Sequence, residues 1–265
     1  MMRELPASVV PVGQALAANA GGYLRNVLRI SGVTCSACGT PTGGYATCYP
    51  CKQQRDSGLP LADRVTSMVY AVKPSASMRD QMYTAMFGYK AATPQLTHTN
   101  VVRSLLALAI LGHVDCDLRL AGMSHFRWTT VAGTQHVGEH PLHRLIAGEP
   151  GTVLSPLFVS GYELETKLRA GATKQRDIRP ENVEVVGGIA PDTHVAVYDD
   201  SWVTGGSAQS VAVALKQAGA RSVSILTVAR VLGPEYSPNA EFLRSEHARR
   251  DFDYRVCPWT GADCP

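Results

Sequence analysis

Two adjacent carboxylates, Asp199 and Asp200, stand directly before a loop of Ser, Thr and Gly in the stretch VAVYDDSWVTGGSAQS, residues 195–210. Acidic side chains accept hydrogen bonds from sugar hydroxyls and can hold Mg²⁺. The loop, residues 201–207, leads into a predicted helix whose first turn offers unpaired backbone N–H groups and a partial positive charge. Its glycines let the backbone approach an anion closely. The combination favours a ligand with a phosphate and a diol, such as a phosphorylated ribose; the alternative is an ordinary strand-to-helix turn with solvated acids.

Four cysteines form a second group that could do chemistry. Their spacing in CSACGTPTGGYATCYPC is C-x₂-C-x₉-C-x₂-C. Each C-x-x-C pair makes a turn that places both sulfurs on one side, and two such turns close a tetrahedral zinc site. Four thiolates leave no open coordination position, so we expect the zinc ion to be structural; the alternative is a set of redox or free dithiols. The predicted ligands are Cys35, Cys38, Cys48 and Cys51.

The elements around the acid pair predict a parallel sheet. A Val-rich strand at 195–198 places the two acids at its carboxyl end, and apolar residues recur at helical spacing over 208–215. Gly219 is suited to end that helix, and SVSILTV, residues 222–228, is the next strand. Strand, helix and strand within about 35 residues make a βαβ unit with a right-handed crossover. Ligands of such units bind outside the carboxyl ends of the strands.

Weaker patterns predict further elements. A buried helix is expected over 101–112, where Gly112 is well placed to end it, and a shorter helix over 140–148. Strands are expected at 126–133 and 152–159, and a short helix at 24–30.

The stretch VAVYDDSWVTGG resembles the phosphoribosyl-pyrophosphate (PRPP) signature of type I phosphoribosyltransferases. A four-cysteine module followed by such a domain resembles the ComF family of competence-related phosphoribosyltransferase-like proteins, in its actinobacterial-type branch. Residues 69–90 are also similar to a family segment that ends in a Lys-Tyr pair, reversed here as Tyr89-Lys90. The signature usually has two consecutive Thr before the Gly, and Val203 replaces the first of them. Trp202 is bulky for this loop, and packing beneath it is a simpler role than stacking on a substrate.

The resemblance implies an α/β chain with a type I phosphoribosyltransferase fold, a central parallel sheet flanked by helices, and a small N-terminal zinc-binding module. The module would span residues 1–60 and the phosphoribosyltransferase-like domain residues 61–265. It also implies a Mg²⁺-dependent transfer of phosphoribosyl from PRPP to a nitrogen nucleophile, with Asp199 and Asp200 as the catalytic acids. The implied PRPP-binding residues are Asp199, Asp200, Ser201, Val203, Thr204, Gly205, Gly206 and Ser207.

One departure favours a second hypothesis, a non-catalytic protein that binds PRPP or a nucleotide and acts in DNA uptake or handling, with single-stranded DNA as a partner. The segment TTVAGTQHVGEHPL stands where type I enzymes hold pyrophosphate; family relatives often carry Arg there, whereas this chain has Glu139, of the wrong sign. Other side chains could take over, or could be ordinary surface residues: His136, His140, His143, Lys167, Lys174, Arg176 and Arg179.

The remaining cysteines are ambiguous. Cys257 and Cys264, with His247 nearby, could complete a second metal site; the alternatives are free thiols or a disulfide. Cys116 is expected to be a small core residue.

Composition bounds these interpretations. The chain has 265 residues, 45% of them apolar and 18% charged, which fits a globular protein with a real core. A net charge of +3 permits an anionic ligand without demanding nucleic acid. Seven cysteines, four of them in two tight pairs, favour metal binding in a reducing, cytoplasmic compartment. No apolar run reaches the ~20 residues that a membrane span needs, and the chain could form an oligomer.

Overall fold

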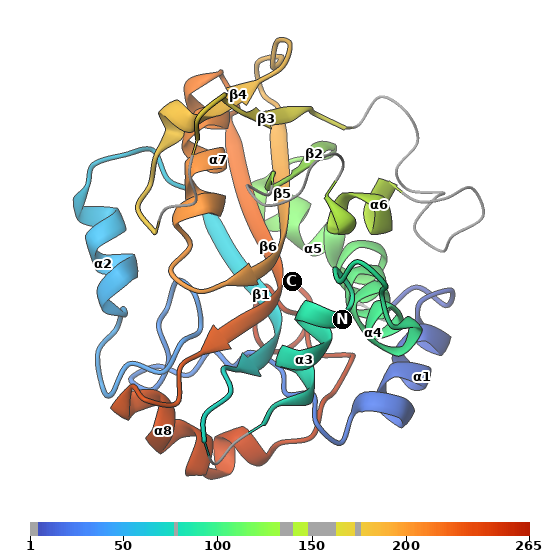
Figure 1. Cartoon of the computed structure of the whole chain (residues 1–265). Coiled ribbons are helices and arrows are strands. Elements are labelled where there is room, and N and C mark those ends of the chain that lie inside the picture. The colour runs from blue at the N-terminus through green and yellow to red at the C-terminus, as the bar shows by residue number, and fades with distance from the viewer. Residues whose placement is uncertain (1–4, 77–78, 133–139, 148–162, 173–175) are drawn as a thin grey trace.

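The computed structural model of this chain describes residues 5–76, 79–132, 140–147, 163–172 and 176–265. Its centre is a sheet of parallel strands in the order β1-β6-β5-β2 (Figure 1). These strands are β1 (Arg64–Val72), β2 (Phe126–Thr130), β5 (His194–Trp202) and β6 (Ser222–Leu232). The prediction of an α/β fold with a central parallel sheet is confirmed.

β5 and β6 form the middle of the sheet and are buried along most of their length. They pair in parallel, with Val195 opposite Val223 and Asp199 opposite Thr227. Helix α7 (Gly206–Gln217) connects them, so the predicted βαβ unit is confirmed. Val and Ile suit these strands because both faces of a buried parallel sheet need apolar side chains.

Helices cover both faces of the sheet, and each face has its own core. Alternate residues of a strand point to opposite faces. On one face Val197 of β5 packs with α7, in a cluster that also holds the four N-terminal cysteines. On the other face Tyr198 packs with α1 (Val10–Ala20), α3 (Gln81–Gly88) and α4 (Leu96–Ala107).

The helix predicted over 101–112 does not end at Gly112. α4 passes into a π-helical turn, Leu108–Gly112, and then into α5 (His113–Ala121). The helical rod ends at Gly122, which has φ +66° in the left-handed region that glycine adopts easily. Close packing explains the glycine at this position instead, because a Cβ on Gly112 would lie 3.2 Å from Leu5.

Smaller elements complete the chain. The short helix predicted at residues 24–30 is wrong. These residues are not helical, and Asn26 forms an antiparallel bridge with Val69 of β1. The predicted strand at 152–159 lies outside the described residues, whereas the predicted helix near 140–148 is present as α6. The other elements are α2 (Tyr49–Asp56), α6 (Pro141–Ala147), β3 (Thr166–Leu168), a 3₁₀ turn at Pro180–Asn182, β4 (Val183–Val185), α8 (Ser237–Arg244) and a 3₁₀ turn at Glu246–Arg249. Within the described ranges, no helix is long and apolar enough to span a bilayer.

Candidate functional site

The acid pair lies near the carboxyl end of β5, but the strand is longer than predicted. It continues through Asp199 and Asp200 as far as Trp202, and parallel pairing with β6 extends to Arg230. Asp199 is half-buried, and its Oδ1 accepts a hydrogen bond of 2.8 Å from the backbone N–H of Asp200. The two carboxylates are therefore held by the sheet itself and not by a free loop.

Asp200 is buried and has a cation of its own. Lys90 Nζ donates to Asp200 Oδ2 at 2.5 Å, and the Tyr89 hydroxyl donates to the same oxygen at 3.1 Å. Ser201 Oγ donates to the other oxygen at 2.7 Å. Tyr89 and Lys90 follow α3, more than 100 residues before the acid pair. In the sequence, these two residues stood out only as the end of a segment that resembles the family, and nothing predicted their contact with Asp200.

The charges at this cluster shift its ionisation. Burial acts to raise the pKa of Asp200, but the Lys90 ammonium outweighs it, with help from Ser201 and the charge of His140, and the pKa lies below its usual value. Burial and the neighbouring Asp200 charge raise the pKa of Tyr89 far above its usual value. Asp200 is thus an ionised carboxylate and Tyr89 a neutral donor at neutral pH.

The predicted phosphate turn is a tight glycine turn at the N-terminus of α7. Gly205 has φ +86°, and a Cβ there would lie 2.1 Å from the ring of Trp202. Trp202 is 1% exposed, so packing beneath the turn, the simpler role predicted for it, is confirmed. A Cβ on Gly206 would lie 2.1 Å from the backbone oxygen of Arg176, so both glycines are required by close contacts. Val203 is exposed at the tip of the turn.

A buried arginine fixes the backbone of this turn. Arg230 of β6 is 5% exposed, and its Nη1 donates to the carbonyl oxygens of Trp202 at 2.7 Å and Val203 at 2.9 Å. These charge-assisted bonds hold the carbonyls toward the protein interior. The backbone N–H groups in the first turn of α7 have no intrahelical acceptors and stay at the edge of the sheet where the acids lie.

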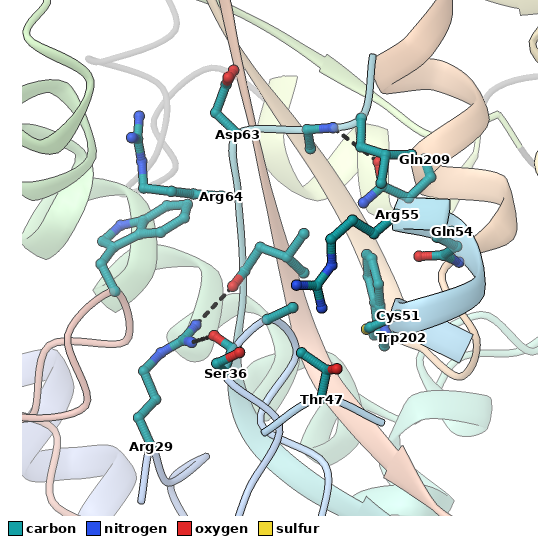
Figure 2. A pocket seen from close by; sticks show the side chains of 15 residues that line it. Arg29, Ser36, Thr47, Cys51, Gln54, Arg55, Asp63, Arg64, Trp202 and Gln209 are labelled. Carbon is teal, nitrogen blue, oxygen red and sulfur yellow. Dashed lines mark hydrogen bonds between the residues drawn. The ribbon is translucent and has the colours of Figure 1, made fainter. Parts of the chain in front are cut away.

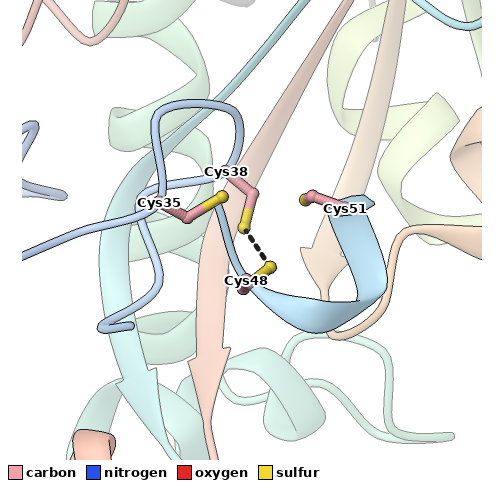
Figure 3. Close-up of side chains that lie close together, drawn as sticks. All are labelled: Cys35, Cys38, Cys48 and Cys51. Atoms are coloured by element: carbon pink, nitrogen blue, oxygen red, sulfur yellow. Dashed lines mark hydrogen bonds between the residues drawn. The ribbon is translucent and has the colours of Figure 1, made fainter. Parts of the chain in front are cut away.

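The four predicted zinc ligands come together in one buried group. The sulfurs of Cys35, Cys38, Cys48 and Cys51 all lie within 4.8 Å of one another (Figure 3). Zn–S bonds of about 2.3 Å in a tetrahedron place sulfurs about 3.8 Å apart. The Cys38 and Cys48 sulfurs are 3.7 Å apart, which fits this geometry and is too long for a disulfide. The group could hold a zinc ion, as predicted.

The cysteine module also touches the glycine turn. α2 begins directly after Cys48 and carries Cys51, and Gln54 on the same helix donates to the carbonyl oxygen of Thr204 at 2.8 Å. Trp202 packs in the same hydrophobic cluster as the four cysteines. A metal bound by the cysteines would therefore stabilise the helix that contacts the candidate phosphate turn.

A cavity of about 350 Å³ lies between the module and the first residues of β1 (Figure 2). Arg29 lines it and is engaged, donating to the carbonyl oxygens of Ser36 at 3.1 Å and Val65 at 2.7 Å. Arg55 extends into the cavity in Figure 2. The lining residues include Trp202 but neither acid of the pair, so this cavity is distinct from the candidate sugar site.

The other side chains proposed for pyrophosphate are only partly described. His143 Nδ1 lies 3.3 Å from Thr130 Oγ1 and its ring packs on Trp128, which suits a structural role. Lys167 pairs with Glu165 at 3.0 Å on the surface. Arg179 pairs with a neighbouring acid at 3.6 Å, and Arg176 contributes its carbonyl to the turn. His140 Nδ1 accepts a hydrogen bond of 3.2 Å from the backbone N–H of Leu142. The candidates His136 and Lys174, and Glu139, which has the wrong sign for this role, lie outside the described residues.

A second polar network lies at the opposite, amino-terminal ends of the strands. His194 Nε2 is 3.0 Å from Asp117 Oδ2 and its Nδ1 is 3.1 Å from Ser222 Oγ, the order of contacts seen in serine hydrolases. His194 is fully buried and Ser222 is 8% exposed, so no substrate can reach the hydroxyl. Arg64 and Ser224 also bind Asp117. This network links the first residues of β1, β5 and β6 to α5 and is structural.

Comparison of the chain with protein-family models, with curated proteins and with solved structures gave no match. A function therefore has to be proposed from the geometry of the site.

Proposed function

We propose that the protein binds PRPP at the carboxyl edge of β5 and transfers its phosphoribosyl group to a nitrogen nucleophile, as type I phosphoribosyltransferases do. The observation that carries the proposal is the position of Asp199 and Asp200 near the end of a central parallel strand, directly before the glycine turn that opens α7. In open parallel sheets, ligands bind outside this edge. We also propose that this α/β fold is of the type I phosphoribosyltransferase kind.

The groups at this edge match the parts of PRPP. The half-buried Asp199 would accept hydrogen bonds from the ribose hydroxyls, and the first turn of α7 would bind the 5-phosphate. Ser207 adds a hydroxyl, whereas the Thr204 hydroxyl already donates to the carbonyl oxygen of Arg176 at 3.3 Å. Lys90 keeps Asp200 ionised, and the buried carboxylate holds Lys90, Tyr89 and Ser201 beside the site. Bound Mg²⁺ would spread the negative charge of the pyrophosphate group.

In this reaction the bond between C1 of the ribose and the pyrophosphate oxygen breaks, and pyrophosphate leaves with the electron pair. The nitrogen lone pair forms the new bond to C1, and the nitrogen loses a proton. The carboxylate at Asp199 would stabilise the positive charge that develops on the sugar ring.

Calorimetric titration tests the binding step. When PRPP is added to the full chain in the presence of Mg²⁺, the heat should show saturable binding. The Asp199→Asn variant should bind PRPP at least tenfold more weakly, because it loses a hydrogen-bond acceptor for the ribose diol. Asp199 suits this test because it is only half-buried, and Asp251→Asn makes the same change at an exposed position. Unchanged binding in Asp199→Asn, with normal folding, would contradict the proposed site.

A turnover assay separates the enzyme from the alternative, a PRPP- or nucleotide-binding protein of DNA handling. The missing Arg in the pyrophosphate segment is the observation that favours this alternative. The protein is incubated with PRPP, Mg²⁺ and a panel of nucleobases, and pyrophosphate release is measured. Release that depends on one base supports the transferase. PRPP binding without release, together with salt-dependent binding to single-stranded DNA, supports the alternative.

A further inference from the structure

We propose that the protein has a second zinc site, formed by His113, Cys116, Cys257 and Cys264, which fastens the C-terminal segment to helix α5. His113 Nδ1 and the three sulfurs lie within 4.8 Å of one another. His113, Cys116 and Cys257 are fully buried, and Cys264 is partly exposed. Three cysteines and one histidine are a common ligand set for structural zinc.

The distances in this group fit a tetrahedral ion. Zn–N and Zn–S bonds of about 2.05 and 2.3 Å place nitrogen and sulfur about 3.6 Å apart. His113 Nδ1 lies 3.5 Å from the Cys264 sulfur and 3.8 Å from the Cys116 sulfur. Thiol–imidazole hydrogen bonds have similar lengths, so the observation that points to an ion is that all four ligand atoms lie within 4.8 Å of one another.

The helix contributes its two ligands through an irregular turn. His113 and Cys116 are three residues apart, so they lie on the same face of α5. The π-helical turn Leu108–Gly112 ends directly before His113. A π turn adds a residue to the helical repeat and so rotates the following residues, and such turns are frequent at functional sites.

The tail contributes the other two ligands through a closed turn. Cys257 N–H donates to the carbonyl oxygen of Ala262 at 2.8 Å, and Gly261 N–H donates to the carbonyl oxygen of Cys257 at 2.8 Å. Gly261 has φ +74°, which glycine adopts without strain. The turn thus presents Cys257 and Cys264 to α5.

The sequence pointed to a different histidine. His247 is nearer to Cys257 along the chain, but its ring stacks on Phe242, with centroids 6.4 Å apart, and it is not part of the cysteine group. Cys116, predicted to be a core residue, is indeed fully buried, yet its sulfur faces the ligand group.

Metal analysis of the purified full chain tests the proposal. With both cysteine groups loaded, we expect about two zinc ions per chain, falling by about one in Cys264→Ala. Cys264→His keeps a ligand atom at the same position and should restore the lost ion. Cys35→Ala removes a ligand of the other group and should cost a different ion, so the double variant should hold about none.

A second readout reports on the attachment of the tail instead of the metal content. Removal of zinc by a chelator should free the tail from α5, so trypsin should cleave after the exposed Arg250 at least tenfold faster than in the untreated protein. The Cys264→Ala variant should show the same increase without chelator. Zinc content that is unchanged in Cys264→Ala would overturn the proposal. So would a disulfide between Cys257 and Cys264 in the native protein, detected by alkylation without reduction and mass measurement.

Discussion

The contact between Lys90 and Asp200 should make a measurable contribution to folding stability. Opposite unit charges about 4 Å apart attract by about 4 kcal/mol when the effective dielectric constant is about 20. The Asp200 side chain is 8% exposed but that of Lys90 is 24% exposed, so water screens part of the attraction. We therefore expect a coupling of about 2 kcal/mol, half of the unscreened value.

A double-mutant cycle isolates this coupling. Lys90→Met should cost about 3 kcal/mol because it leaves a buried carboxylate without its cation. Asp200→Asn should cost about 2 kcal/mol because the charge-assisted bonds are lost. The double variant should then cost about 3 kcal/mol, less than the sum of about 5 kcal/mol, since removing both partners leaves no buried unpaired charge.

The assay is urea unfolding followed by tryptophan fluorescence, with the free energy of unfolding taken by linear extrapolation. The surface pair of Lys167 and Glu165, with both side chains about half exposed, is the matched control and should couple by less than about 1 kcal/mol. If the Lys90 and Asp200 effects add within about 0.5 kcal/mol, the two side chains do not form a buried ion pair and the reasoning is refuted.

Two further predictions concern the same edge of the sheet. Gly205→Ala should destabilise the protein by about 1–3 kcal/mol, because φ is +86° and a Cβ would meet the Trp202 ring at 2.1 Å; Gly188→Ala, where a Cβ meets nothing within 4 Å, should leave the urea midpoint nearly unchanged. The depressed pKa of Asp200 contributes stability above the unfolded-state pKa of about 3.9 that is lost as the pH falls through the folded-state pKa. Asp200→Asn should therefore lose less stability than the wild type between about pH 5 and pH 3, and equal losses would contradict the pKa shift.

The sequence predicted the βαβ unit and the four-cysteine group because their signals are local. The spacing of apolar residues in β5, α7 and β6 follows directly from the periods of strands and helices. Each C-x-x-C turn likewise places its two sulfurs on the same side, whatever the rest of the fold. The end of β5 was less predictable, since polar residues up to Ser201 stay in the strand only because β6 pairs with them.

The contacts that the sequence could not predict join distant segments. No spacing rule relates Lys90 to Asp200, which meet because the residues that follow α3 reach the end of β5. His113 was hidden for a different reason, since Gly112 is typical of a helix end and the π turn carries the helix past it. A glycine near the end of an apolar helix can thus mark close packing as well as termination.

The hydrogen bond from Gln54 to Thr204 would make the two proposed binding events interdependent, metal at the cysteines and ligand at the glycine turn. If metal in the cysteine module favours the ordered turn, then thermodynamic reciprocity requires that a ligand ordering the turn tighten the hold on the metal by the same factor. The rate at which a chelator removes zinc would then report, from a distance, whether the turn is occupied.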